Sequence, residues 1–245
     1  MARTQSDGLA DAARYRHEAL GVVLRVTEQT LSVLCWQRSR EPYGGAWAVP
    51  SGPVMPGETL GACVARQLAS RVDIAEIAHL EQLETRSDPD RDPSQRTIAT
   101  AYLGVVPVTA DPQLPESAAW LNSAALPAMA FDHASVIASA VDRLRSKLSY
   151  SNLGFALAPA EFTIAQLAEI YSIALERGIS PTNLQRVLQR RGQLEPTGRT
   201  AHSSSAGGRP AALFRFSHRR LEITDPFAVL RPSHAALGAD RLDRA

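Results

Sequence analysis

The sequence lacks long apolar runs and has few cysteines and lysines. No stretch reaches the ~18 uncharged apolar residues of a membrane-spanning helix, so we expect no membrane span. The first 16 residues carry acids and no apolar core, which argues against a secretory signal. Cys35 and Cys63 lack metal-ligand spacing, and we expect reduced, buried thiols in a cytoplasmic protein. Lys147 is the single lysine among 26 basic residues.

The remaining composition is that of an ordinary globular protein. Hydrophobic residues make up 44% of the 245 residues and charged residues 21%. This balance excludes collagen, a coiled coil and wholesale disorder. At ~150 residues per domain, the length predicts one to two domains.

Charge is distributed unevenly along the chain. Residues 1–155 hold 14 basic and 17 acidic residues, whereas residues 156–220 hold 9 basic and 4 acidic residues. A basic block that follows an acidic one indicates two modules, the second of which faces an anionic partner.

The first module reads as mixed α/β and ends near Tyr150. Apolar alternation predicts strands, and apolar stripes at helical spacing predict helices. The segment 43–53 is predicted to be a loop with a short strand, and the segment 110–127 is predicted to be loop-rich with Trp120 as a core anchor. The expected elements are strands at 20–26, 31–36, 79–85 and 97–108, and helices at 58–72 and 132–148.

The second module has the order of a winged helix-turn-helix. After a predicted linker at 155–161, Thr163 can cap a helix that Gly178 ends. Ser180 and Pro181 suit the start of a second helix, which Gly192 stops. A basic, acid-free segment at 197–210 and a strand at 212–217 would form the wing.

The second of these helices has one apolar face and one polar face without acids. Leu184, Val187 and Leu188 would face the core, which leaves amide, hydroxyl and guanidinium groups for base edges and phosphates. A small helical dimerisation domain with a solvated basic face is the alternative. The predicted DNA-binding residues are Thr163, Thr182, Asn183, Arg186, Gln189, Arg190, Arg191, Arg199 and Arg209.

The first module contains an altered motif. Gly52, Glu58 and Arg66 have the spacing of the Nudix box, which this segment resembles. The three glutamates that bind metal in that box fall on Gln67, Ser70 and Arg71, and its glycine falls on Asp73.

These replacements remove the expected metal chemistry. Positions 67, 70 and 71 share one helix face, where carboxylates of a Nudix enzyme would hold Mg²⁺ against a pyrophosphate. Two neutral side chains and a guanidinium stand there instead, so we expect no catalytic residue and no metal site. Arg71 would either pair with a pyrophosphate in place of the metal or be a solvated surface residue.

The whole arrangement resembles the Nudix-related transcriptional regulators of bacterial NAD metabolism. The resemblance rests on the altered box, the 88–93 segment DPDRDP, the helix from Asp132, and the order of second-module motifs up to 214–216. It implies an N-terminal Nudix-like α/β/α sandwich and a C-terminal winged helix-turn-helix domain. The implied divisions are a flexible N-terminus (1–17), an effector-binding domain (18–150), a DNA-binding domain (156–225) and a tail (226–245).

The resemblance also implies a function. Such proteins are homodimers that bind double-stranded operator DNA and repress NAD biosynthesis or salvage genes. They sense ADP-ribose or a related NAD-derived nucleotide, need no cofactor, and act in the cytoplasm on the nucleoid. The longer wing and the extra tail depart from the family pattern. Residues expected to bind the effector are Arg38, Trp47, Gly52, Glu58, Arg71, Arg91 and Arg96.

Two other functions remain open at this stage. One is an active Nudix pyrophosphatase with a DNA-binding tail, and the other is a nucleotide-sensing adaptor that contacts protein. The 132–148 helix lies between the modules and is the expected coupling element. It carries Lys147, for which regulation by acylation is a further hypothesis.

Overall fold

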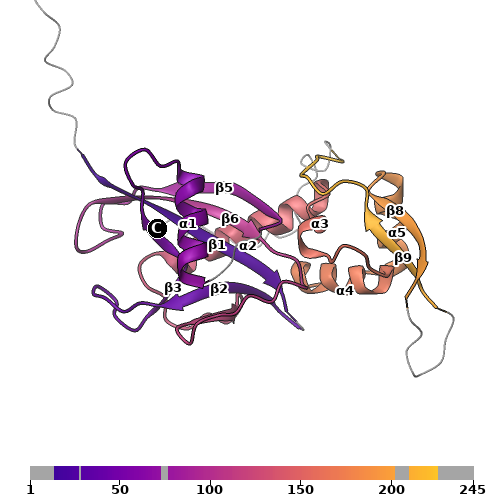
Figure 1. Ribbon diagram of the computed structural model, residues 1–245, viewed down its shortest axis with the longest axis horizontal. Helices are drawn as coiled ribbons and strands as arrows, with labels where there is room; N and C mark the ends of the chain where they lie inside the picture. The colour runs from indigo at the N-terminus through magenta and orange to yellow at the C-terminus, as the bar shows by residue number, and fades with distance from the viewer. Residues whose placement is uncertain (1–13, 28, 73–76, 202–209, 226–245) are drawn as a thin grey trace, which may run out of the picture.

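The computed structural model describes residues 14–27, 29–72, 77–201 and 210–225, although not the side chains of residues 71 and 72. Figure 1 shows a sheet with its helices at one end and a smaller helical unit with a two-stranded hairpin at the other. Among the described helices, none combines the length and hydropathy needed to span a bilayer.

The N-terminal unit is built on a seven-stranded sheet. Its main strand order is β3-β2-β1-β6-β5, with β4 paired to β1 and β7 paired to β2. The two central strands, β1 and β6, run parallel, and the other pairs are antiparallel. The strands are β1 (Arg16–Val26), β2 (Leu31–Gln37), β3 (Trp47–Ala48), β4 (Ser51–Pro53), β5 (His79–Arg86), β6 (Thr97–Val105) and β7 (Ala118–Asn122).

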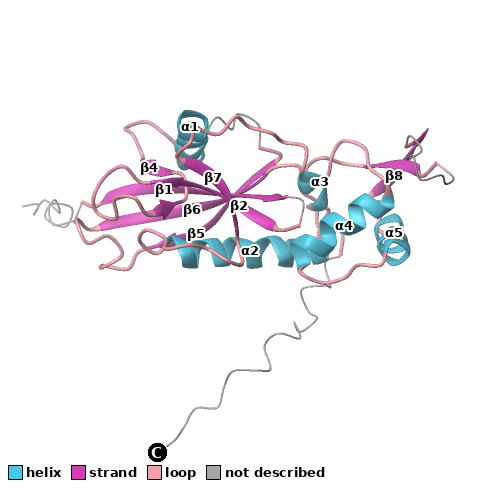
Figure 2. Cartoon of the chain, turned by 90° about the horizontal axis from the view of Figure 1, so that it is seen from below, coloured by secondary structure: helices cyan, strands magenta, loops and turns pink. Residues whose placement is uncertain are grey.

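Helices cover both faces of this sheet, as Figure 2 shows. The helix α1 (Leu60–Val72) packs Cys63, Val64 and Leu68 against one face. Gly21 allows this close approach, because a Cβ there would lie 3.1 Å from a Val64 methyl group. The predicted Nudix-like α/β/α sandwich is therefore confirmed.

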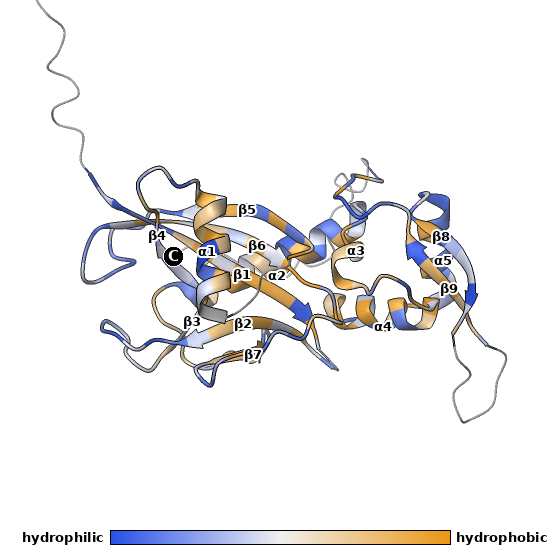
Figure 3. Ribbon diagram, viewed as in Figure 1, coloured by the Kyte–Doolittle hydropathy of each residue, from blue (hydrophilic) through white to orange (hydrophobic). Residues whose placement is uncertain are grey.

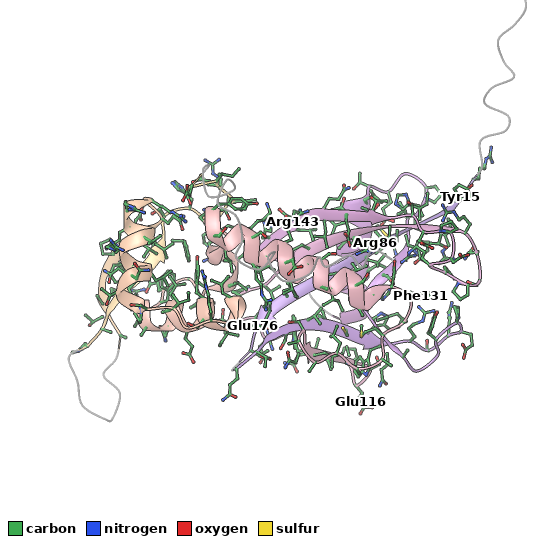
Figure 4. All side chains as sticks on the ribbon, turned by 180° about the vertical axis from the view of Figure 1, so that it is seen from behind. Tyr15, Arg86, Glu116, Phe131, Arg143 and Glu176 are labelled. Atoms are coloured by element: carbon green, nitrogen blue, oxygen red, sulfur yellow. The ribbon has the colours of Figure 1, made fainter. Side chains whose placement is uncertain are left out.

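The opposite face is covered by α2 (His133–Tyr150), whose predicted apolar stripe is buried. Arg86 donates to the Ser139 hydroxyl over 3.2 Å, and Arg143 donates to the Leu83 carbonyl over 3.3 Å. Figure 4 shows Arg86 and Arg143 along the same side of the helix. These bonds join α2 to the edge strand β5.

The C-terminal unit has the predicted winged-helix order. It contains α4 (Ile164–Leu175), α5 (Pro181–Arg190) and the antiparallel hairpin β8 (Leu194–Thr200) with β9 (Ala212–Phe216). Thr163 caps α4 through a complete capping box with Gln166, and the Ser180 side chain caps α5. Figure 3 shows hydrophobic residues on the inner parts of both units.

The predicted linker was wrong. Residues 155–161 do not form an open linker, because α3 (Gly154–Leu157) lies there and is buried in the same apolar cluster as α2 and α4. The segment 110–127, predicted to be loop-rich, also contains the five-residue strand β7, which pairs with β2 in register Leu34 to Trp120. Trp120 is partly buried against the α1 side of the sheet, under the guanidinium of Arg25 at 4.4 Å.

Candidate ligand pocket and DNA-binding surface

A polar cavity of about 580 Å³ opens near the N-terminal end of β1. Strands β1, β2 and β4 supply its walls together with the loop before β6 and the residue before Asp132. The cavity is large enough for a nucleotide-sized molecule. Its lining residues are Arg16, Glu18, Trp36, Arg38, Ser39, Arg40, Glu41, Pro42, Ser51, Gly52, Pro53, Asp92, Ser94, Gln95 and Phe131.

Both arginine and acidic side chains line this cavity. Arg16 pairs with Glu18 at 2.7 Å, two positions along the same strand. Arg38 donates to the Pro42 carbonyl at 3.0 Å and the Arg40 carbonyl at 3.5 Å, which folds the 38–42 loop around its guanidinium. Guanidinium groups suit phosphate oxygens, and carboxylates accept hydrogen bonds from sugar hydroxyls.

Phe131 provides a flat surface at the cavity. Its backbone has a φ of 53°, a left-handed conformation that is unfavourable for a bulky side chain. The Arg38 guanidinium lies 4.6 Å from the centre of the ring, and the Tyr43 ring meets it edge-on at 4.9 Å. Figure 4 shows Phe131 near the end of α2 that lies away from the winged helix.

Asp92, in the loop before β6, is an acidic residue in the cavity wall. Its carboxylate accepts hydrogen bonds from the Ser94 amide at 3.0 Å and hydroxyl at 2.6 Å, and from the Thr97 hydroxyl at 3.2 Å. Burial raises the pKa of Asp92, but these hydrogen bonds and the nearby Arg91 outweigh it, so the pKa falls below its usual value. Asp92 therefore stays anionic at neutral pH.

The altered box offers a single carboxylate between residues 52 and 72, that of Glu58. Gln67 is 4% exposed and packs under Gly52, where an added Cβ would overlap its amide. Glu58 is held by Arg66 at 2.7 Å and by the Met55 amide at 3.0 Å, and these bonds lower its pKa to about 2. Within the described ranges, no three His, Cys, Asp or Glu side chains gather as metal ligands. The divalent cation of Nudix chemistry does not fit these residues.

Arg91, which the sequence predicted to bind the effector, is not among the residues that line the cavity. Its side chain is 3% exposed and makes two hydrogen bonds to Asp132, at 2.7 and 3.2 Å. This pair ties the DPDRDP loop to the beginning of α2. In this arrangement Arg91 joins two segments of the fold and is nearly buried.

Only some of the other residues predicted to bind the effector line the cavity. Arg38 and Gly52 line the cavity, whereas Trp47, Glu58 and Arg96 do not. Trp47 packs on the core next to Met129, and Arg96 donates to the Ser87 carbonyl at 2.8 Å. The side chain of Arg71 lies outside the described residues.

Several cavity residues were not anticipated from the sequence. Arg16, His17 and Glu18 form a polar start to a strand that is apolar from residue 19 to residue 24, and this pattern could have indicated a polar site at its end. Phe131 carries no local signal, because only the fold brings it beside Arg38.

The exposed face of α5 forms the candidate DNA-binding surface. Leu184 and Leu188 are buried, and Val187 is partly buried, as the helical pattern predicts. Arg186 donates to the Asn183 side chain at 2.8 Å, which orders the two groups side by side. The helix contains no acidic residue. Its exposed predicted side chains are those of Thr182, Asn183, Arg186, Gln189 and Arg190.

Three other residues predicted to contact DNA are engaged within the protein. Thr163 is buried as the cap of α4. Arg191 pairs with Asp225 at 2.7 Å and donates to the Ser149 carbonyl at 3.0 Å. Arg199 is exposed on β8 and pairs with Glu161. Arg209 lies outside the described residues.

The two units meet at the C-terminal half of α2. Arg145 pairs with Glu176 at 2.7 Å and donates to the Ala174 carbonyl at 3.1 Å, and Figure 4 shows Glu176 at this junction. Lys147 pairs with Glu81 of β5 at 2.9 Å with 14% of its side chain exposed. One helix thus contacts the sheet and the end of α4.

Comparison with known proteins assigns a family to both units. Residues 15–140 match the NUDIX domain family, and residues 154–216 match the NrtR DNA-binding winged helix domain. An ADPR-responsive transcriptional repressor of Acinetobacter baylyi is 30% identical over 219 residues, which is 86% of each chain.

A solved structure agrees with this match. The NrtR protein of Shewanella oneidensis, crystallised with a 27mer DNA, superposes with a TM-score of 0.70 at 27% identity, covering 81% of this chain and 92% of that one. An ADP-ribose pyrophosphatase of Methanocaldococcus jannaschii is 30% identical over 129 residues, 50% of this chain and 73% of its own.

Proposed function

Because the chain belongs to the NrtR family of Nudix-related transcriptional regulators, we propose that it is a DNA-binding transcriptional repressor of NAD biosynthesis or salvage genes. It acts as a homodimer on operator DNA in the cytoplasm. Its effector is ADP-ribose or a related NAD-derived nucleotide, held in the polar cavity. The observation that carries the DNA-binding role is the acid-free, exposed face of α5.

The proposed effector site uses guanidinium groups in place of a metal. Arg16, Arg38 and Arg40 line the cavity and can meet the two phosphates of ADP-ribose. Carboxylates of Glu18 and Glu41 are placed to accept hydrogen bonds from ribose hydroxyls. The domain boundaries that we propose remain 18–150 for the effector domain and 156–225 for the DNA-binding domain, flanked by 1–17 and 226–245.

The effector and DNA surfaces lie at opposite ends of α2. Its 18 residues span about 27 Å at 1.5 Å per residue. The Arg91–Asp132 pair lies at the cavity end, and the Arg145–Glu176 pair lies at the winged-helix end. A nucleotide changes DNA affinity if it binds two arrangements of these ends unequally.

The test is a duplex-binding titration with DNA from upstream of this gene and of NAD biosynthesis genes, with and without ADP-ribose, at two salt concentrations. We expect selective binding that weakens steeply with salt and changes with ADP-ribose. A scrambled duplex and the Arg186→Ala/Arg190→Ala variant serve as controls. Selective duplex binding whose affinity is the same with and without ADP-ribose would show that ADP-ribose is not the effector. Absence of selective binding would favour an adaptor that contacts protein.

The competing function is an active pyrophosphatase, which the similarity to the archaeal ADP-ribose pyrophosphatase suggests. We propose that this chain is not an enzyme, because Gln67 and Ser70 supply no carboxylate and Glu58 is already paired with Arg66. Release of AMP from ADP-ribose that depends on Mg²⁺ would overturn this view.

A further inference from the structure

The segment that follows β9 returns across the molecule to the end of α2. We call residues 218–225 the terminal strap. They lie beyond the winged-helix match, which ends at residue 216. Figure 1 shows this yellow-orange segment near α3, away from the tip of the hairpin.

Asn152 anchors the middle of the strap. It is 3% exposed, and its side-chain amide donates to the carbonyls of His218 at 3.4 Å and Arg220 at 2.8 Å. Its side-chain oxygen accepts from the Glu222 amide at 2.8 Å, and its own amide donates to the Glu222 carbonyl at 3.1 Å. One buried side chain therefore holds three backbone groups of the strap.

The end of α2 continues this attachment. The Tyr150 carbonyl accepts from the amides of Thr224 at 2.9 Å and Asp225 at 3.0 Å. Ser151 and Ile223 form an antiparallel bridge between these two bonds and Asn152. The strap thus pairs with the chain segment 150–152 through backbone hydrogen bonds, as two short antiparallel strands do.

The same strap also contacts the C-terminal end of α5, the candidate DNA-binding helix. Arg191 is the C-cap residue of α5 and pairs with Asp225 at 2.7 Å, with 13% and 17% of the two side chains exposed. Arg191 also donates to the Ser149 carbonyl in the last turn of α2. Gln193, the residue before β8, donates to the Thr224 hydroxyl.

We infer that the terminal strap is a positioning element that fixes α5 relative to α2 and so sets the separation of DNA half-sites that the protein accepts. The inference rests on the proposed DNA-binding function. Arg191 and Asp225 act as positioning residues, since neither faces the exposed side of α5. The pair is largely buried and joins two residues that lie 34 positions apart in the chain. Its loss therefore releases the C-terminal end of α5 from the strap without removing a DNA-facing side chain.

The test compares two full-length variants that each remove one carboxylate from the strap. Asp225→Ala breaks the pair with Arg191. Glu222→Ala is the matched control, because its side chain pairs at the surface with Arg220 two positions away. ADP-ribose affinity and the melting temperature are measured on both, so that a general loss of folding is recognised.

Two readouts apply to each variant. Hydrogen exchange is followed at the amides of 150–152, 191–193 and 224–225, where we expect Asp225→Ala to accelerate exchange about tenfold over the control. DNA affinity is measured on duplexes whose half-sites are separated by different spacers. We expect Asp225→Ala to flatten the preference for one spacing, whereas a loss of stability alone would lower affinity equally for all spacings.

The outcomes separate this inference from the proposed function. Unchanged exchange and unchanged spacing preference in Asp225→Ala would overturn it. Faster exchange with an intact spacing preference would also overturn it, because the strap would then stabilise without positioning. If the wild-type chain binds no duplex, the proposed function fails and with it the half-site role. Exchange alone then decides whether the strap holds α5 to α2, with Asn152→Ala as the second variant.

Discussion

At the scale of single side chains, Arg38 connects several parts of the cavity wall. It contacts two carbonyls of its own loop and the face of Phe131 while lining the cavity. We predict that Arg38→Ala weakens ADP-ribose binding at least about tenfold, since a charge-assisted hydrogen bond contributes about 1.5–3 kcal/mol. Isothermal titration calorimetry measures the change.

Arg96→Ala is the matched control for this prediction. Its guanidinium donates to the Ser87 carbonyl and lies over the Tyr15 ring at 5.2 Å, outside the cavity lining. The control should bind ADP-ribose like the wild type. Equal losses in both variants would mean that general surface charge, and not the cavity geometry, attracts the nucleotide.

His133 makes stability depend on pH. It is 2% exposed, its Nδ1 accepts from the Val49 amide at 3.2 Å, and burial lowers its pKa to about 3. The unfolded chain binds a proton below pH ~6.5, whereas the folded chain does not. The free energy of unfolding should therefore be highest above that pH and fall by about 1.4 kcal/mol per pH unit below it, until the pKa of about 3 is reached.

The measurement is urea unfolding at pH 7.5 and pH 5 for His133→Asn, which keeps an acceptor for Val49 and cannot titrate. This variant should lose less stability between the two pH values than the wild type. His218→Asn changes an exposed histidine and should retain the wild-type dependence. An identical dependence in His133→Asn would contradict the assignment.

At the scale of elements, we expect α5 to make two kinds of DNA contact. Arg186 lies in the middle of the exposed face and Arg190 at its C-terminal end. We predict that Arg186→Ala costs about 1–3 kcal/mol and relaxes selectivity at one base pair. Arg190→Ala should weaken binding to all duplexes and reduce the salt slope by about 1.

These effects are measured by anisotropy on a panel of operator variants at several salt concentrations. Arg177→Ala is the control, because Arg177 is exposed just after α4 and outside the α5 face. If Arg177→Ala weakened binding as much as Arg186→Ala, the DNA-binding surface would have to be extended beyond α5.

The predictability of each element depends on where its stabilisation comes from. Helices α4 and α5 have caps and stripes within their own sequences, at Thr163 and Ser180, and both were predicted. Strand β7 has no such local pattern and exists because β2 offers it a partner. Helix α3 contains a short apolar run before Pro159, and only its burial between the units makes it helical rather than an open linker.

At the scale of the whole molecule, the junction between the units is tightly packed at Gly154. A Cβ at this position would overlap the hydroxyl of Tyr171, which is buried without a hydrogen-bond partner among the described residues. We predict that Gly154→Ala destabilises the protein by about 1–3 kcal/mol through overpacking. Denaturant unfolding measures the loss.

Gly61→Ala is the control, since nothing lies within 4 Å of a Cβ there and the position is inside α1. It should leave stability unchanged or raise it slightly, because alanine favours a helix over glycine. Destabilisation by Gly61→Ala as large as that by Gly154→Ala would show that the effect is not specific to the junction.

The sequence by itself determined the two-unit organisation, the altered Nudix box and the polar face of α5. These features depend on periodicity, spacing and residue chemistry, which are local properties. Only the tertiary structure decided that Arg91 and Arg191 are internal ion-pair partners, and that Phe131 joins Arg38 at the cavity. Their roles depend on neighbours distant in the chain, and a linear pattern does not encode which guanidinium meets a carboxylate and which meets solvent.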